Sequence, residues 1–332
     1  MAFVYDTIVD PASTNNSYAY MLDFTGFNKR VLEVGCATGY FSKVLNDRGC
    51  HVVGIERDPE AAAVAEQWAE RVVVGDLDAG TLWQELEGEQ FDVITFGDVL
   101  EHLRDPLTTL RTAVRLLKPS GTVVISVPNI AHGDVRIALL GGAFQYTEIG
   151  LLDRTHLRFF TKATLRDLVR DAGLLLVDTS RVVVPLFATE LAVGKDSVSQ
   201  AMVTQILDDP EAQTYQFVVK AVLDDGSHAV AALAERAEAL GDQVHGLSMH
   251  QARLHRELEE SREAARSARE EAEQCRRQAA QAEEHRRQAE EYRQQAEALL
   301  ATKTFRLVAP LRRLYGRVTR YTGEPNARTP GG

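Results

Sequence analysis

The stretch KRVLEVGCATGY, residues 29–40, constrains the fold more strongly than any other part of the chain. Residues 30–34 are mostly apolar and β-branched, which predicts a short buried strand. Small residues follow, and apolar residues then recur at helical spacing from Tyr40 to Asn46. A strand, a turn of small residues and a helix bring backbone N–H groups close to a ligand at the helix N-terminus. The sequence therefore predicts a ligand-binding turn near its beginning.

Two classes of ligand fit this turn. A dinucleotide fingerprint requires small residues at its first, third and sixth positions. Counted from Gly35, the sixth position is Tyr40, whose size weakens the nicotinamide interpretation. The stretch instead resembles motif I of class I S-adenosylmethionine-dependent methyltransferases, with Ala37 where a central Gly is common. The residues that carry this resemblance, and that it implies bind the cofactor, are Glu33, Gly35, Cys36, Ala37, Thr38 and Gly39.

Strand and helix patterns alternate through the first two thirds of the chain, which predicts an α/β fold with a parallel sheet covered on both faces. The resemblance implies a doubly wound, mostly parallel seven-stranded Rossmann-like sheet whose last strand runs antiparallel. The predicted strands are residues 30–34, 51–55, 71–74, 90–97, 122–127, 174–184 and 215–223.

Acidic residues end the second and third predicted strands. Glu56 follows the Gly turn by about 20 residues, where a carboxylate can accept hydrogen bonds from both ribose hydroxyls. The resemblance gives Glu56 that role, with Arg57 beside it, and places Asp76 and Leu77 at the adenine ring. An exposed acid at a strand end is the alternative interpretation of Glu56.

The fourth predicted strand opens into DVLEHL at residues 98–103. Strand ends form the ligand crevice of doubly wound sheets, so Asp98 is predicted to contact the cofactor and Glu101 and His102 to contact the reacting groups. His102 titrates near neutrality and suits a general base for an acceptor hydroxyl. His156, in LLDRTHLRFFT, is the third candidate catalytic residue, in a predicted substrate wall.

A divalent metal is a further hypothesis. DVLEH, followed later by a His before an aromatic–Thr pair, resembles two magnesium-dependent groups: ubiquinone-pathway O-methyltransferases and small-RNA 2′-O-methyltransferases. The resemblance implies the ligands Asp98, Glu101, His102 and His156, of which Asp98 replaces the more usual Glu. A bound Mg²⁺ lowers the pKa of an acceptor hydroxyl. The alternatives are a general base at His102 or His156, and a purely structural His102, so the metal stays open. His132 is predicted to contact substrate or lie on the surface.

Composition limits compartment and partners. The three cysteines are scattered and form neither a disulfide framework nor a metal-spacing cluster, which favours a reducing cytosol. No signal peptide and no run of about 18 apolar residues is expected, so a cytoplasmic protein is predicted. A peripheral contact with the inner face of the membrane is assigned to its tail. The net charge of −11 is concentrated in the first 228 residues, which argues against a nucleic-acid partner.

Three segments are predicted: a methyltransferase domain at 1–226, a coiled coil at 227–301 and a basic amphipathic tail at 302–332. From residue 228 to 300 there is no Pro, and two sets of mainly apolar positions each recur every seven residues. The Leu-rich first half predicts a homo-oligomer. The Ala-rich second half, where Arg286 and Arg293 occupy repeat positions, is either a weak coiled coil or a single solvated helix.

Residues 302–321 interleave arginines with apolar residues, which predicts a helix lying on an anionic membrane surface or on a partner protein. The phrase TFRLVAPLR resembles a segment that follows coiled coils in bacterial surface-glycan glycosyltransferases and their associated enzymes.

The sequence predicts an S-adenosylmethionine-dependent O-methyltransferase. GLLDRTHLRFFT resembles bacterial methyltransferases of the methionine-biosynthesis and glycan-modifying type, so a sugar hydroxyl of a cell-envelope glycan is the expected acceptor. One alternative is a small-molecule or quinone-type O-methyltransferase, with Ile137, Leu139 and Phe144 forming an apolar crevice. The other is a coiled-coil scaffold with an inactive methyltransferase-like domain.

Overall fold

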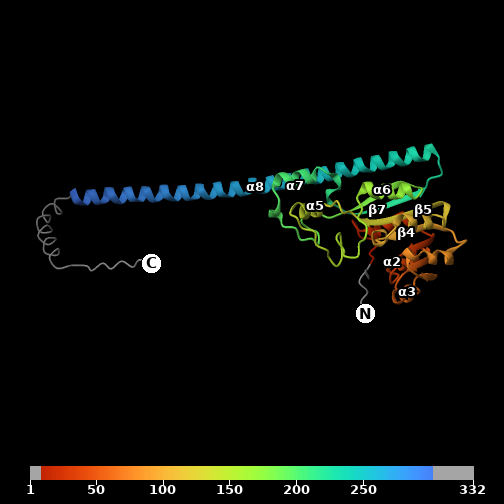
Figure 1. The fold of residues 1–332 in the computed structure, drawn as a ribbon. Helices are drawn as coiled ribbons and strands as arrows, with labels where there is room; N and C mark the ends of the chain where they lie inside the picture. Colours follow the sequence, from red (N-terminus) through yellow and green to blue (C-terminus); the bar gives the residue numbers. More distant parts are fainter. Residues whose placement is uncertain (1–8, 302–332) are drawn as a thin grey trace. The chain divides into compact units, whose positions relative to one another are not determined.

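The computed structural model describes residues 9–301, apart from the side chains of residues 228 and 229. Its centre is a seven-stranded sheet in the order β3-β2-β1-β4-β5-β7-β6 (Figure 1). Strands β1 to β5 are parallel, and β7 runs antiparallel to both β5 and β6. This confirms the predicted doubly wound, mostly parallel sheet. The strands are β1 Arg30–Val34, β2 His51–Glu56, β3 Arg71–Val74, β4 Phe91–Gly97, β5 Leu117–Pro128, β6 Leu174–Val183 and β7 Thr214–Leu223.

The helices that connect the strands begin where the sequence supplies caps. Asp58 and Asp105 accept backbone N–H bonds at the starts of α3 and α4, each followed by a Pro in the first turn. Helix α3 ends at Ala65, and β5 begins five residues before its predicted start, at Leu117. The helices are α1 Ser17–Thr25, α2 Tyr40–Asp47, α3 Pro59–Ala65, α4 Pro106–Val114, α5 Gly133–Leu140, α6 Lys162–Asp171, α7 Gln200–Leu207 and α8 His228–Ala301.

Alternation along the strands divides the interior into two apolar layers. In β5, Val124 packs with α1 and α2, whereas Val123 and Ile125 pack on the opposite face with α4 and α6. Figure 1 shows α2 and α6 on opposite sides of the sheet. Because both faces are covered, the parallel strands consist mainly of apolar residues. The carboxyl ends of the strands are therefore where the ligand crevice is expected.

Helix α8 begins as part of the sheet domain. Ala234 is buried, and Asp242 forms ion pairs with Lys162 of α6 and Arg181 of β6. The chain divides into two compact units between Ala252 and Arg253, whereas the limit predicted for the methyltransferase domain is residue 226. The second unit is described as helix as far as residue 301, with side chains that are nearly all exposed. Within the described residues, no helix is apolar over enough of its length to cross a membrane.

Candidate active site

One cavity of about 680 Å³ lies at the carboxyl ends of β1, β2 and β4. A volume in this range suits a cofactor together with a small acceptor. The cavity brings together residues that are far apart in the sequence, from the motif I turn, the ends of β2, β3 and β4, and the loop after α5. The candidate site residues that line it are Gly35, Ala37, Glu56, Arg57, Asp76, Leu77, Asp98, Glu101, His102 and His156.

The motif I turn is tight because two of its positions have no room for a side chain. Gly35 has φ +75°, and a Cβ there would lie 2.5 Å from Cγ2 of Val99. Gly39 has φ +79°, and a Cβ there would lie 2.9 Å from Cα of Ala65. Ala37 also adopts a positive φ, 46°, which is uncommon for a residue other than Gly. These positions keep the backbone of the turn close to the cavity.

Glu56 is held in place by the backbone around it. Its Oε2 accepts from the N–H of Ala37 at 2.9 Å, and its Oε1 accepts from the N–H groups of Arg57 and Asp58 at 2.8 Å each. A carboxylate offers about four lone-pair positions, so it can still accept from a ligand hydroxyl. The carboxylate is thus fixed at the cavity edge, as a ribose-binding acid requires.

Three motif I residues lie behind the turn rather than in the cavity lining. Cys36 and Thr38 are buried, and Glu33 is 5% exposed with its carboxyl accepting a short hydrogen bond from Ser42 of α2. Burial raises the pKa of Glu33 to about 8. Their position indicates that these residues shape the turn from beneath it.

Asp98 ends β4 in a left-handed conformation, with φ 56°. Its Oδ1 accepts from Ser126 Oγ at 3.1 Å and from the Gln216 side-chain amide. Burial raises the pKa of Asp98 to about 6. Since β5 and β7 supply these donors, the tertiary structure turns Asp98 toward the sheet, although one edge of it still lines the cavity.

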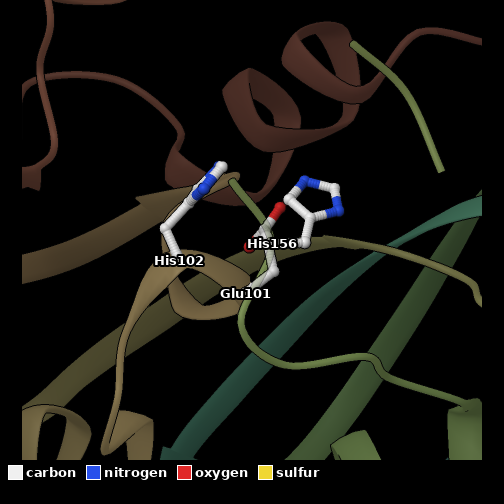
Figure 2. A group of neighbouring side chains, drawn as sticks. All are labelled: Glu101, His102 and His156. Atoms are coloured by element: carbon white, nitrogen blue, oxygen red, sulfur yellow. The ribbon is translucent and has the colours of Figure 1, made fainter. Parts of the chain in front are cut away.

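Glu101, His102 and His156 gather at one wall of the cavity. Figure 2 shows Glu101 and His102 on one short segment, with His156 reaching them from a separate loop. One ligand atom from each residue lies within 4.8 Å of the others, and the two imidazole centroids are 4.9 Å apart. Burial lowers the pKa of both histidines, and His102 lowers the pKa of His156 further. Both rings are therefore neutral near pH 7 and offer a nitrogen lone pair.

Glu101 is 1% exposed, and neither of its carboxylate oxygens has a hydrogen-bond partner among the described residues. Burial, and then the nearby Asp98, raise the pKa of Glu101 well above its usual value. An unpartnered buried carboxyl is costly unless it is protonated or faces a cation. Together with two neutral imidazoles, it is a donor set that suits a divalent ion. Asp98 is not part of this donor set, so three of the four ligands implied by the resemblance lie together here.

Asp153 and Thr155 fix the orientation of the His102 ring. Thr155 Oγ1 donates to Asp153 Oδ1 at 2.7 Å, so it acts as an acceptor toward His102 Nδ1, 3.1 Å away. The Thr155 carbonyl oxygen, which can only accept, lies 3.3 Å from the same nitrogen. Both contacts require Nδ1 to carry the proton. Nε2 is consequently the nitrogen of His102 that has a lone pair.

The loop carrying His156 is anchored by Glu190. Its Oε1 accepts from the N–H of Leu151 at 2.6 Å, and its Oε2 accepts from the Tyr215 hydroxyl at 3.1 Å. A Cβ at Gly150, which has φ +97°, would lie 2.1 Å from Glu190 Oε1. Glu190 therefore joins the predicted substrate wall to the beginning of β7.

His132 differs from its prediction. It is fully buried, its Nε2 lies 2.9 Å from the Val184 carbonyl oxygen, and its Nδ1 accepts from the N–H of Asp134. It caps α5 and does not line the cavity. The expectation of a surface or substrate-contacting residue is wrong, because the segment after β5 folds under the loop that precedes α7.

Exposed apolar side chains lie at and beside the part of the cavity wall that contains His156. Ile149 and Leu157 line the cavity and are more than half exposed. The Phe144 ring lies 5.4 Å from that of Tyr146 and 6.2 Å from that of Phe159, and Phe159 contacts the His156 ring. An exposed apolar group of this kind marks a binding surface. Of the residues expected to form an apolar crevice, Phe144 is part of this exposed apolar group, whereas Ile137 is buried in a separate cluster with Ile206 and Ala212.

Sequence patterns missed the residues that hold the reacting groups. Thr155 lies in a recognisable segment, but its pairing with His102 spans 53 residues of chain. Glu190 and Gln216 belong to no motif, and only the sheet brings them to the cavity. The one signal for Asp153 was its place among charged residues next to two phenylalanines.

Comparisons with known proteins agree with this geometry. A family model described as a methyltransferase domain matches residues 16–179. The ubiquinone biosynthesis O-methyltransferase of Aeromonas salmonicida is 31% identical over 180 residues, which cover 51% of this chain and 73% of that protein. The protein of the same name from Cereibacter sphaeroides is 32% identical over 164 residues, 49% of this chain and 66% of that protein. The chain thus spans just under two thirds of the second relative.

Two solved structures resemble the chain at low identity. One is a SAM-dependent methyltransferase from Archaeoglobus fulgidus, 19% identical with a TM-score of 0.44, covering 61% of this chain and 89% of that one. The other is the 1,6-didemethyltoxoflavin-N1-methyltransferase of Burkholderia thailandensis, 23% identical with a TM-score of 0.41, covering 63% and 77%.

Proposed function

This chain belongs to the class I S-adenosylmethionine-dependent methyltransferases, and from that premise we propose that it methylates a hydroxyl group of a small organic acceptor with an apolar body. The observation that supports the proposal is that one cavity contains both the strand ends expected to bind the cofactor and the side chains of Glu101, His102 and His156. Exposed aromatic side chains lie beside His156. The cofactor is S-adenosyl-L-methionine, which supplies an electrophilic methyl group when bound.

The cofactor side of the cavity is built by β1, β2 and β3. Gly35 and Ala37 bring the backbone close, and the Glu56 carboxylate is positioned to accept from the ribose hydroxyls. Asp76 and Leu77, which follow β3 and line the cavity, would meet the adenine ring by a hydrogen bond and by packing. Glu33, Cys36 and Thr38 support the turn without lining the cavity.

The acceptor side uses the neutral histidines. His102 presents Nε2 with a lone pair, so it can take the proton of the acceptor hydroxyl as the oxygen attacks the methyl group. His156, whose ring centroid lies 4.9 Å from that of His102, orients the same hydroxyl. The Asp153 carboxylate, acting through Thr155, stabilises the positive charge that develops on His102.

A phenolic hydroxyl suits this site better than a sugar hydroxyl. Aromatic and aliphatic side chains at the mouth pack favourably against a flat apolar acceptor, and curated relatives are named ubiquinone biosynthesis O-methyltransferases. The glycan acceptor expected from sequence rests on a resemblance that nothing at this rim supports. An inactive scaffold is disfavoured because the chain is a methyltransferase with a complete cavity.

A divalent cation is the alternative to general-base catalysis by His102, because both would use the lone pair of Nε2. Glu101, His102 and His156 would hold it, and when bound it would lower the pKa of the acceptor hydroxyl. The buried carboxyl of Glu101, without a partner among the described residues, is what supports this ligand set.

The partners of the chain include, in this proposal, a second copy joined through α8. The membrane or glycosyltransferase contact predicted for residues 302–332 falls outside the described residues and stays a prediction. A cytoplasmic location, with or without a peripheral membrane contact, also stays a prediction.

Titration calorimetry with S-adenosylmethionine tests the cofactor side. Glu56→Ala is expected to weaken binding about 10- to 150-fold, the equivalent of losing about 1.5–3 kcal/mol from hydrogen bonds to a charged group. Glu60→Ala, at an exposed acid four residues away, is the matched control and should bind as the wild type does. Equal affinity of a folded Glu56→Ala variant and the wild type would contradict the assigned ribose contact.

Release of S-adenosylhomocysteine in the presence of catechol or 3,4-dihydroxybenzoate tests the acceptor class, with methyl glucoside and UDP-glucose as sugar acceptors. We expect turnover with the phenols, lost in His102→Ala and kept in His51→Ala, which alters an exposed histidine on β2. Turnover of sugars but not of phenols would overturn the small-molecule acceptor and restore the glycan prediction.

Electron paramagnetic resonance of added Mn²⁺ tests the cation without any acceptor. Glu101→Gln and His156→Ala should each lower the affinity at least tenfold, whereas Asp98→Asn should change it little, because Asp98 lies outside the donor set. Absence of Mn²⁺ binding by the folded wild type would refute the metal part of the proposal alone.

A further inference from the structure

Helix α8 meets the sheet domain through a polar face. Arg181 pairs with both Glu211 and Asp242 at 2.8 and 2.7 Å, and Lys162 also reaches Asp242. His245 Nε2 lies 3.1 Å from the Pro210 carbonyl oxygen. Together with the buried Ala234, these contacts occupy the side of α8 defined by residues 234, 242 and 245.

The apolar side chains of the same helix segment remain exposed. Leu233 and Leu247 are 68% and 70% exposed, and Val230, Leu240 and Val244 lie on the same side. At 100° per residue, this stripe is displaced roughly 130° around the helix from the docked face. A soluble helix normally buries its apolar side against its own domain, so the reversed arrangement indicates that another partner covers the stripe.

The stripe has the pattern of a coiled-coil seam. Its residues alternate at three- and four-residue steps, which assigns Val to two core a positions and Leu to successive core d positions. Gln251 is the polar member of the a series. The a series is Val230, Ala237, Val244, Gln251 and Leu258, and the d series is Leu233, Leu240, Leu247 and Leu254.

We propose that this stripe pairs with the same stripe of a second copy of the chain in a parallel, in-register, two-stranded coiled coil. β-Branched residues at a with Leu at d favour two strands, and a polar residue at one a position favours a fixed register in which it meets itself. Glu257 and Arg262 occupy flanking g and e positions that face each other between parallel copies, so their charges are complementary.

The docked face of α8 adds a reason for two strands rather than three. A three-stranded bundle buries a wider arc of each helix, whereas the sheet domain already covers the side that contains Ala234 and Asp242. The cavity lining contains no residue of α8, so pairing through the stripe leaves the active site open. Pairing is carried mainly by the first part of α8, because the later a and d positions are mostly Ala.

Light scattering of the full chain at tens of micromolar tests the number of copies. The expected mass is twice 36.7 kDa. The double variant Leu240→Lys, Leu247→Lys should weaken association at least 100-fold while leaving the monomer folded, since both side chains are exposed within one chain. Leu140→Lys, at a similarly exposed leucine on α5, is the matched control and should remain a dimer. A monomeric or trimeric wild type would overturn the proposal.

Cross-linking tests the orientation. Gln251→Cys in a Cys275→Ser background should form a disulfide between copies on mild oxidation, because residue 251 meets itself only in the parallel register. Cys36 and Cys50 are buried and serve as internal controls that should not react. A dimer that gives no cross-link would refute the parallel arrangement. Since S-adenosylmethionine binding is measured separately, failure of the dimer and failure of the methyltransferase assignment are distinguishable.

Discussion

Glu33 shows how a residue can complete a motif without lining the cavity. It belongs to the acid–Gly pattern of motif I, yet its carboxyl is buried against α2 and bonded to Ser42. Burial raises the pKa of Glu33 to about 8, so the carboxyl is protonated in the folded protein at neutral pH. In the unfolded chain the same group ionises near its ordinary value of about 4.3.

The first prediction concerns the pH dependence that follows. Between about pH 4.5 and 8 the folded state holds a proton that the unfolded state has lost, so Glu33 makes the protein less stable as the pH rises, by at most about 1.4 kcal/mol per pH unit. Glu33→Gln should flatten the decrease in Tm between pH 5 and 8, measured by calorimetry without cofactor. Ser42→Ala is the control for the lost hydrogen bond. An identical pH profile in Glu33→Gln would contradict this account.

His102 depends on residues that the sequence did not connect to it. The Thr155 hydroxyl and carbonyl both accept from Nδ1, and Asp153 fixes the hydroxyl. Thr155 is therefore a positioning residue, which acts on the reaction through the His102 ring.

Long-range ¹H–¹⁵N spectra of His102 test this second prediction. The wild type should show the Nδ1–H tautomer, Thr155→Val should raise the fraction of the Nε2–H tautomer several-fold, and Thr155→Ser should restore the wild-type spectrum. The carbonyl of residue 155 remains in every variant, which is why a partial shift is expected. A wild-type Nε2–H tautomer would refute the assignment.

At the scale of secondary-structure elements, the docking of α8 depends on a buried charge cluster. Arg181 is 8% exposed and lies between Glu211 and Asp242, with His245 beside them. Burial, and then Arg181, lower the pKa of His245, whereas Glu211 acts in the opposite direction. The docked helix therefore disfavours a protonated His245.

The third prediction is that acidification loosens the first part of α8. A histidine whose pKa is lowered by folding contributes stability above its unfolded pKa of about 6.5 and loses it below that value. Asp242 has a pKa below its usual range and therefore stays ionised in this window. Hydrogen exchange of residues 230–250 should be faster at pH 5.5 than at pH 7.5, and His245→Gln should reduce the difference. Equal protection at both pH values would count against the cluster as a pH-sensitive contact.

At the scale of the whole molecule, the contacts extend the sheet domain into a helix that the composition assigns to another segment. Residues 1–252 form one compact unit, whereas composition changes at about residue 227. The composition changes where the repeat of α8 begins. The compact unit extends further because Ala234 is buried, Asp242 pairs with Lys162 of α6 and Arg181 of β6, and His245 lies against Pro210.

The fourth prediction compares two truncations. A chain of residues 1–226 should be less stable than one of residues 1–252 by about 2 kcal/mol, roughly 4–8 °C in Tm, because Arg181 and Lys162 lose Asp242. Asp242→Ala in the longer chain should reproduce part of the loss. Equal Tm values would show that the first part of α8 adds nothing to the stability of the sheet domain.

The sequence by itself determined the fold class, the parallel direction of most strands and the tight turn of motif I. These depend on local causes: strand periodicity, caps such as Asp58 and the absence of side chains at Gly35 and Gly39. Residues at strand ends, such as Glu56 and His102, were also predictable, because the carboxyl ends of parallel strands share one edge of the sheet.

Only the tertiary structure decided how the reacting groups are held. Asp98 is turned away from the histidines by Ser126 and Gln216, and His132 is buried beneath a loop that no motif predicts. His102 and Thr155 are 53 residues apart in the chain yet form a hydrogen bond. Contacts with β6 decide which face of α8 is docked on the sheet domain and which face stays exposed. Such pairings depend on which segments pack together in space, and the pattern of residues along the chain does not specify this.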